Sequence, residues 1–283
     1  MRFAPAGVLT LMVALAWPFS TAWAAGGEGV DDQATTLELT YNLYAGGVPL
    51  GRVSLSARIR ESGYTAASTL ETVGLANAFW RAKLEGSSFG SVDGRGPHPS
   101  TYEAFSIHSE TRGNRQQVTV TYDNGLPTFV ASPPYTSVVP VSDEDRMGTL
   151  DPISALIFFT TSYEANRQKP CSLVAPVYDG RRRYDVTLDF VRKRDIRMDN
   201  GLYRGQVDEC RLTYTAVAGA RQRVFENGDP PNVFGWVASV ASGNDPAKRL
   251  LMPLRIWAET DYGIVVALAT KVTLDGSDLA TIN

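Results

Sequence analysis

Apolar and polar residues alternate with a period of two along most of this chain, and no other feature constrains its fold as strongly. In "TLELTYNLY", residues 36–44, the side chains of Leu37, Leu39, Tyr41 and Leu43 fall on one side of an extended segment. The matching positions after the Gly-rich turn that follows are Val53, Leu55, Ala57 and Ile59. This period is typical of antiparallel strands that bury one face and expose the other. The sequence therefore predicts a mainly β protein built from hairpins.

Two further hairpins can be placed from their turns. "QQVTVTYDNGLPTFV", residues 116–130, contains an Asn-Gly pair, which favours a two-residue turn. Near the C-terminus, residues 254–274 are expected to form two strands on either side of "TDYG". In that hairpin we expect these residues to share one face: Leu254, Ile256, Ala258, Ile264, Val266 and Leu268.

One segment departs from the strand pattern. "TLDPISALIFFTTSYEANR", residues 149–167, offers Asp151 as an N-cap and Pro152 at the first helical position. The apolar residues that follow at helical spacing are Ile153, Leu156, Ile157 and Phe159. We expect a strongly curved antiparallel sheet, an open barrel or β-spiral, wrapped around or capped by this one main helix. Its apolar face would form a ligand groove or a lid.

The N-terminus has the pattern of an export signal. Arg2 precedes an apolar run at residues 6–17, which is too short to cross a bilayer as a mature helix. Ala22 and Ala24 form an A-x-A cleavage site, so residues 1–24 are predicted to be a cleaved signal peptide. The alternative, an uncleaved membrane anchor, is disfavoured by the shortness of the apolar run. We therefore expect an exported, periplasmic protein with no transmembrane segment in the mature chain.

The charge and length of the mature chain indicate which partners and how many domains to expect. The chain has 27 Lys and Arg against 30 Asp and Glu, a formal charge of −3 that becomes −4 when Arg2 is removed. A slightly acidic chain is a poor match for nucleic acid. Residues 25–283 are predicted to form a single β-rich domain, since all-β domains often reach this size.

Two cysteines, Cys171 and Cys210, remain in the mature chain. In an exported protein a pair predicts a disulfide, which would stabilise the fold by about 4 kcal/mol in the entropy model. The alternatives are two free buried thiols or half of a metal site. No C-x-x-C spacing and only two histidines accompany the pair, so we predict no metal and no cofactor.

"GSSFG" around Ser88 matches the pattern of a hydrolase nucleophile elbow, but it lies in a strand-like segment with no helix after it. A hydrolase of envelope polymers would need Ser88 to meet His98 or His108. Small residues in a curved strand are the simpler explanation. We therefore expect a protein that is not an enzyme.

The arginine triplet in "VYDGRRRYDVTL", residues 177–188, looks at first like an anion site. A two-residue turn at Asp179-Gly180 would instead form a hairpin, with Tyr178 opposite Arg181. Arg181 and Arg183 would then lie on the outer face, as an exposed rim that a partner protein could contact. Cys171 precedes this hairpin, so its disulfide would fasten the hairpin to a later segment.

These segments resemble a bacterial envelope family known as domain of unknown function 3108. The resemblance rests on "YNLYAGGVPLGRVSLSARI" at 41–59, "DPISALIFF" at 151–159, "VYDGRRRYDVTL" at 177–188 and "MPLRIWAETDYGIVVAL" at 252–268. It implies an exported, β-rich protein of Gram-negative bacteria with no agreed catalytic residues, so no active site is carried over.

From these observations we expect a non-catalytic periplasmic protein that supports the cell envelope by binding a partner protein or an apolar ligand. One alternative is a lipid or lipoprotein carrier that uses the concave sheet, with Ile153, Leu156 and Phe159 lining the cavity. The other is the envelope-polymer hydrolase described above.

Overall fold

A computed structural model describes most of the chain. The described residues are 34–79, 81–108, 114–135, 137, 139–163, 167–220, 232–245, 247–260 and 263–282. All of them belong to one compact unit, Asp32–Asn283. The expected signal peptide lies outside the described residues. Among the described residues, no helix has the length and apolar character needed to span a membrane.

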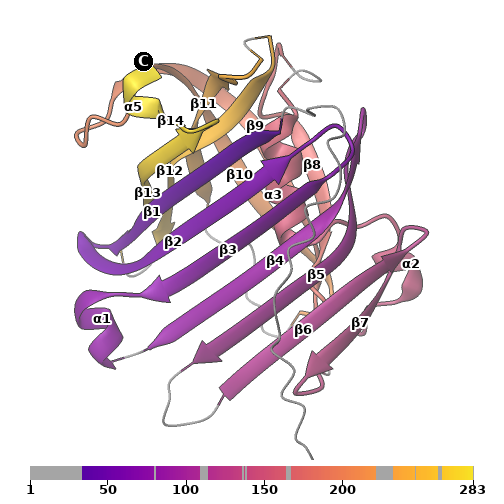
Figure 1. Cartoon of the computed structure of the whole chain (residues 1–283). Helices are drawn as coiled ribbons and strands as arrows, with labels where there is room; N and C mark the ends of the chain where they lie inside the picture. The colour runs from indigo at the N-terminus through magenta and orange to yellow at the C-terminus, as the bar shows by residue number, and fades with distance from the viewer. Residues whose placement is uncertain are drawn as a thin grey trace, which may run out of the picture. The chain divides into compact units, whose positions relative to one another are not determined.

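The secondary structure is dominated by one sheet of fourteen strands, shown in Figure 1. The first half contains β1 (Thr35–Ala45), β2 (Val48–Ile59), β3 (Tyr64–Thr72), β4 (Ala82–Asp93), β5 (Gly96–His108), β6 (Asn114–Asp123) and β7 (Leu126–Ser132). The second half contains β8 (Leu173–Tyr178), β9 (Arg183–Arg197), β10 (Arg204–Ala218), β11 (Val233–Ala241), β12 (Arg249–Thr260), β13 (Gly263–Leu274) and β14 (Ser277–Asp278). The helices are α1 (Gly74–Phe79), α2 (Asp143–Arg146), α3 (Pro152–Thr161) and α5 (Leu279–Ile282).

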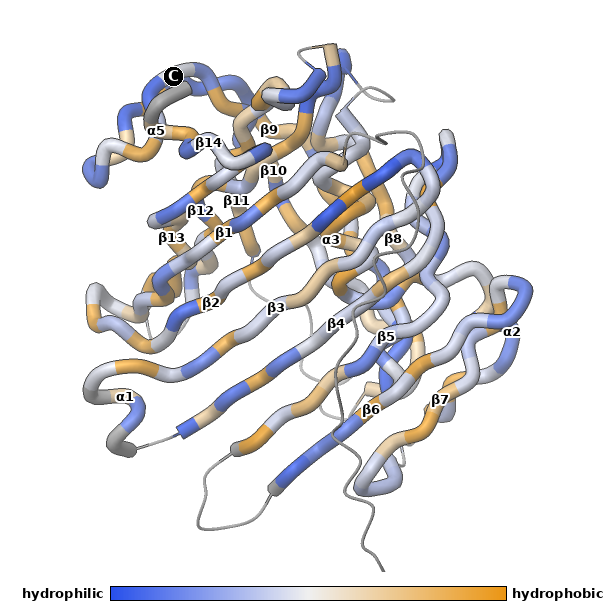
Figure 2. The backbone as a smooth tube through the Cα atoms, viewed as in Figure 1, coloured by the Kyte–Doolittle hydropathy of each residue, from blue (hydrophilic) through white to orange (hydrophobic). Residues whose placement is uncertain are grey.

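The strand order is β7-β6-β5-β4-β3-β2-β1-β13-β12-β11-β10-β9-β8, and β14 pairs with β13. All these pairings are antiparallel, and β1 joins the two halves by pairing with β13, with Leu37 opposite Leu274. Along the strands, hydrophobic and hydrophilic residues are interspersed (Figure 2). The alternation in β1 is confirmed, since Leu37, Leu39 and Tyr41 are buried.

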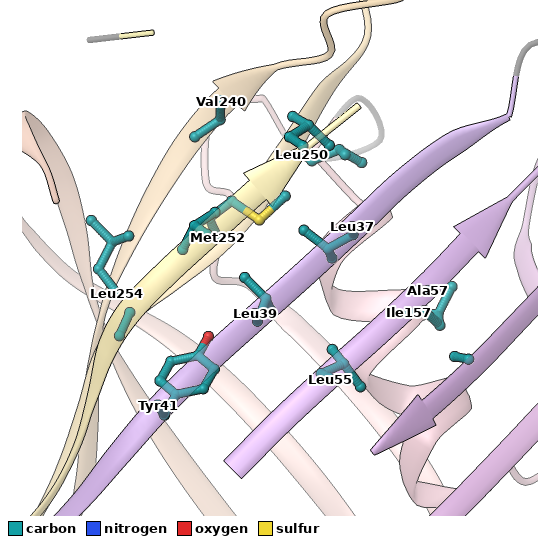
Figure 3. Packing of buried hydrophobic residues seen from close by; sticks show 14 of the residues in the cluster. Leu37, Leu39, Tyr41, Leu55, Ala57, Ile157, Val240, Leu250, Met252 and Leu254 are labelled. Atoms are coloured by element: carbon teal, nitrogen blue, oxygen red, sulfur yellow. The ribbon is translucent and has the colours of Figure 1, made fainter. Parts of the chain in front are cut away.

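The sheet curves around α3. This helix contacts β3, β4 and β5 in one half and β8 and β12 in the other, and Figure 1 shows it between them. The main hydrophobic core contains Ile157 of α3 together with residues from both halves of the sheet. Figure 3 shows part of this core, in which Leu39 of β1 lies near Met252 of β12; Leu55 and Leu254 belong to the same cluster.

The two edge strands approach each other without forming a ladder. The rings of Phe129 in β7 and Tyr178 in β8 meet edge to face, with their centroids 5.9 Å apart. Arg146 of α2 lies over both rings and donates to the carbonyl oxygen of Pro127 at 3.0 Å. Leu150 covers the β8 edge through two backbone hydrogen bonds of 2.8 Å. The predicted curved, unclosed antiparallel sheet with a main helix after Asp151 is thus confirmed.

The expected register of the C-terminal hairpin is wrong. Ile256 lies opposite Ala267, whereas Val266 lies opposite Trp257. The residues Ile264, Val266 and Leu268 therefore share a face with Trp257 and Arg255 and not with Ile256 and Ala258. Both faces of β12 carry large apolar side chains. The alternation therefore did not determine which residues of β13 share a face with Ile256 and which share a face with Trp257.

Candidate functional site

Helix α3 begins where the sequence predicts. Asp151 has an extended backbone, and its Oδ1 accepts hydrogen bonds from the backbone nitrogens of Ile153 and Ser154, both at 2.9 Å. Pro152 occupies the first turn, where a missing N–H has no consequence. This cap fixes the start of the helix inside the curved sheet.

A buried polar network attaches this helix start to the sheet. Ser88 of β4 donates to Asp151 Oδ2 at 2.8 Å, and the hydroxyl of Tyr64 in β3 lies 2.6 Å from that of Ser154. Asp151 is fully buried, and this burial raises its pKa above the usual range despite the hydrogen bonds that it accepts. Burial also raises the pKa of Tyr64 to about 12, so its hydroxyl stays protonated.

Ser88 and His98 do not meet. Ser88 is buried and bound to Asp151, whereas the exposed His98 contacts Asp93 at 2.9 Å. The hydrogen bond from His98 lowers the pKa of Asp93 to about 2. The side chain of His108 lies outside the described residues. In this geometry the hydroxyl of Ser88 bonds to the residue that caps α3 and attaches the helix to β4.

An apolar pocket lies between α3 and the second half of the sheet. Its volume is about 100 Å³. Two of the three helix residues expected to form a groove or lid, Leu156 and Phe159, line it. The third, Ile153, is buried on the side of the helix that faces β4, close to Gly86. The remaining lining residues are Thr160, Pro170, Cys171, Leu188, Cys210, Leu212, Phe234, Gly235, Val237, Leu251, Pro253 and Ile256.

The Cys171–Cys210 disulfide is present and forms part of the wall of this pocket. Its Cα atoms are 5.8 Å apart and both cysteines are buried. Cys171 precedes β8 and Cys210 lies in β10, so the bridge connects the edge of the sheet to a strand two positions inward. The predicted link between the arginine hairpin and a later segment is confirmed.

The hairpin between β8 and β9 has a different register from the one expected. Tyr178 lies opposite Arg183 and not opposite Arg181, so four residues form the connection. Asp179 explains the longer loop, because its Oδ1 accepts from the backbone nitrogens of Arg181 and Arg182 at 2.9 and 2.7 Å. Its Oδ2 also forms an ion pair with Arg182 at 2.8 Å.

Arg181 and Arg183 are both engaged within the chain. Arg181 donates to the carbonyl oxygen of Pro133 at 3.2 Å and lies over the ring of Tyr135. Arg183 pairs with Asp185 at 2.7 Å, and its side chain is only 13% exposed. The contacts of Arg181 tie the hairpin to the loop that follows β7, whereas the pair between Arg183 and Asp185 lies within β9. The role of both arginines as a partner rim stays a prediction.

Sequence reasoning missed most of the pocket. Leu188, Leu212, Val237 and Ile256 come from four separate strands, and no local pattern indicates that they meet around one helix. Gly235 was the one sequence signal that could have indicated the pocket, since a glycine inside a strand often marks a site where a ligand or another backbone segment approaches closely. No cluster of three or more potential metal-ligating residues occurs in the described part of the chain.

Comparison with known proteins gives the family. The family model described as "Protein of unknown function (DUF3108)" matches residues 40–270, most of the chain. The chain belongs to the DUF3108 family. The resemblance noted in the sequence is thereby confirmed. No curated protein matches this DUF3108 chain.

Two solved structures are similar to this DUF3108 protein. A β-barrel-like protein of the domain of unknown function DUF1849 from Brucella abortus has a TM-score of 0.54 and 11% identity. That match covers 85% of this chain and 98% of the other, and it supports the fold alone. A putative lipoprotein from Parabacteroides distasonis ATCC 8503 has a TM-score of 0.29 and 8% identity, covering 86% of this chain and 96% of the other.

Proposed function

We propose that this DUF3108 protein is a non-catalytic periplasmic protein that binds an apolar group in the pocket beneath α3. The observation that carries the proposal is the pocket lining: among the described residues it contains no charged side chain and only one hydroxyl, that of Thr160. Burying an apolar group there is favourable, whereas a charged ligand would lose its hydration without gaining a partner.

The volume limits the ligand. An apolar cavity of about 150 Å³ stays dry and binds benzene. A pocket of about 100 Å³ therefore fits an aromatic ring or a short alkyl segment. Leu156 lines the pocket and is 44% exposed, so the pocket reaches the surface beside it. A lipid would insert only part of its chain through this opening, unless α3 moves.

The proposed location rests on two features. The disulfide is typical of proteins outside the cytoplasm, where an oxidising environment maintains it. The N-terminal sequence matches a cleavable export signal. The non-catalytic role is supported by Ser88, whose hydroxyl is committed to Asp151. Binding of a partner through Arg181 and Arg183 has weaker support, because both side chains already have partners in the chain.

The test fills the pocket. Gly235→Leu places a side chain in it without a backbone clash, since a Cβ there would be no closer than 3.5 Å to any neighbour. Thr213→Leu adds the same side chain on the exposed face of β10, where Thr213 lies next to Leu212, and serves as the control. We expect the wild type and the control to bind the neutral dye N-phenyl-1-naphthylamine, whose phenyl ring enters the pocket while its naphthyl group stays at the opening beside Leu156. Binding should be at least tenfold weaker in Gly235→Leu. Equal binding in all three proteins, or no binding by the wild type, would contradict the proposal.

A further inference from the structure

A second hollow lies on the opposite face of the same strands. Its volume is about 550 Å³, and it extends between the β1–β2 turn, the β9–β10 turn and strands β11 to β13. Trp236 and Arg255 line it, whereas their neighbours Val237 and Ile256 line the apolar pocket. Because successive side chains of a strand point to opposite faces, the sheet separates the two sites.

Arg255 lies against two indole rings, which meet each other edge to face with their centroids 5.6 Å apart. Its guanidinium carbon lies 4.9 Å from the ring centre of Trp236 and 5.3 Å from that of Trp257. The register places Arg255 directly opposite Trp236 on the neighbouring strand, and Phe234 stacks on Trp257 beyond it. This stack orients the guanidinium while leaving its charge unneutralised.

Arg255 has no anionic partner in the described part of the chain. It forms no ion pair there, and its Nε is buried without a hydrogen-bond acceptor. The indole nitrogen of Trp236 is likewise buried without an acceptor. An unsatisfied buried donor costs about 1–3 kcal/mol, so two of them lining one hollow call for an explanation. A ligand acceptor would provide it once a small shift of the two side chains exposes these nitrogens to the hollow.

The remaining lining residues indicate the chemistry of that ligand. Arg197, at the end of β9, adds a second positive charge. Ile264, Val266 and Leu268 of β13 form an apolar side, on the same face as Arg255. Asp199 supplies the one carboxylate of the lining and forms no ion pair with either arginine within the described residues. The site thus combines a cationic part with an apolar part.

We propose that this hollow binds an amphiphilic anion. Its oxyanion, a phosphate or a carboxylate, contacts the guanidinium of Arg255, and its apolar body lies along Ile264, Val266 and Leu268. A guanidinium binds such an oxyanion through two parallel hydrogen bonds. This site is separate from the one in the proposed function, and each can fail without the other.

Tryptophan fluorescence provides the readout, because Trp236 and Trp257 flank Arg255. The probes are octyl phosphate below its micelle concentration, inorganic phosphate and the uncharged octyl glucoside. We expect octyl phosphate to change the fluorescence at saturable concentrations and to bind at least tenfold more tightly than either other probe. Equal binding of inorganic phosphate would show that a free anion is recognised and would overturn the amphiphile proposal. Equal binding of octyl glucoside would overturn the role of the charge.

Variants locate the site. Arg255→Gln should weaken octyl phosphate binding at least tenfold, and Arg255→Lys, which keeps the charge but not the paired donors, should weaken it less. Arg211→Gln is the matched control, since Arg211 also stacks on an aromatic ring, that of Phe234, but lies outside the hollow. We expect it to bind like the wild type.

Two further results complete the test. If both Arg255 variants bind octyl phosphate like the wild type, the proposal is wrong. Gly235→Leu, which fills the apolar pocket, should leave octyl phosphate binding unchanged. A loss of binding in that variant instead would place the octyl chain in the apolar pocket and overturn the separate site.

Discussion

The hydroxyl of Ser88 donates a 2.8 Å hydrogen bond to the carboxylate of Asp151, and both residues are buried. This bond joins the middle of β4 to the residue that caps α3. It explains why a serine with the sequence surroundings of a nucleophile lies in a strand. Its role is to hold the helix that covers the apolar pocket.

Removing this hydroxyl should destabilise the protein. We expect Ser88→Ala to lower the free energy of unfolding by about 1–3 kcal/mol, because the buried Oδ2 of Asp151 loses one of its hydrogen bonds. Ser87→Ala, on the exposed face of the same strand, should change it by less than about 0.5 kcal/mol. Urea unfolding followed by circular dichroism measures both. Equal stabilities of the two variants would show that the bond contributes nothing.

Asp151 should also make stability depend on pH. Burial raises its folded pKa above the ordinary value of 3.8, so the folded state holds this proton more tightly than the unfolded state. The resulting stabilisation is fully present below pH 3.8 and is lost as pH rises through the folded pKa. Asparagine caps helices as well as aspartate but does not titrate. The free energy of unfolding of Asp151→Asn, relative to wild type, should therefore increase as pH rises from this value.

The measurement is urea unfolding of both proteins between about pH 3.5 and 8. Other titrating groups are common to the two proteins and largely cancel in the difference. A difference that stays flat, or that decreases as pH rises, would contradict the assignment to Asp151.

How far the fold follows from sequence depends on whether the deciding interaction is local. The start of α3 was predictable because Asp151 and Pro152 act on their immediate neighbours. The burial of Leu37, Leu39 and Tyr41 was predictable because one face of β1 is clearly apolar.

Register and sites were harder to predict, for physical reasons. Asp179 lengthened its turn through side-chain bonds to two backbone nitrogens, which outweighed the ordinary preference of an Asp-Gly pair. In β12, the neighbours Ile256 and Trp257 are both large and apolar and lie on opposite faces. Alternation therefore does not tell which of them shares a face with Val266 of β13. Arg255 and Trp236 come together only through the pairing of β11 with β12, and no local sequence motif predicts that contact.

The approach of the two sheet edges can be tested at Gly180. This residue has φ +83°, and a Cβ built on it would lie 2.1 Å from Cγ1 of Val118 in β6. Gly180→Ala should therefore lower the free energy of unfolding by about 2–4 kcal/mol, through left-handed backbone strain and overpacking. Gly94→Ala is the control, since a Cβ there meets nothing within 4 Å. Equal melting temperatures for the two variants would show that the β8–β9 loop does not pack against β6.

The disulfide should contribute to stability and to the shape of the apolar pocket. It spans 39 residues, so removing it through Cys171→Ala with Cys210→Ala should lower the free energy of unfolding by about 4 kcal/mol in the entropy model. Reduced wild type should resemble this double variant, because both lack the constraint on the unfolded chain. Because the two sulfurs belong to the pocket wall, affinity for N-phenyl-1-naphthylamine should change as well. Urea unfolding with and without a phosphine reductant measures stability, and a double variant as stable as the oxidised wild type would contradict this account.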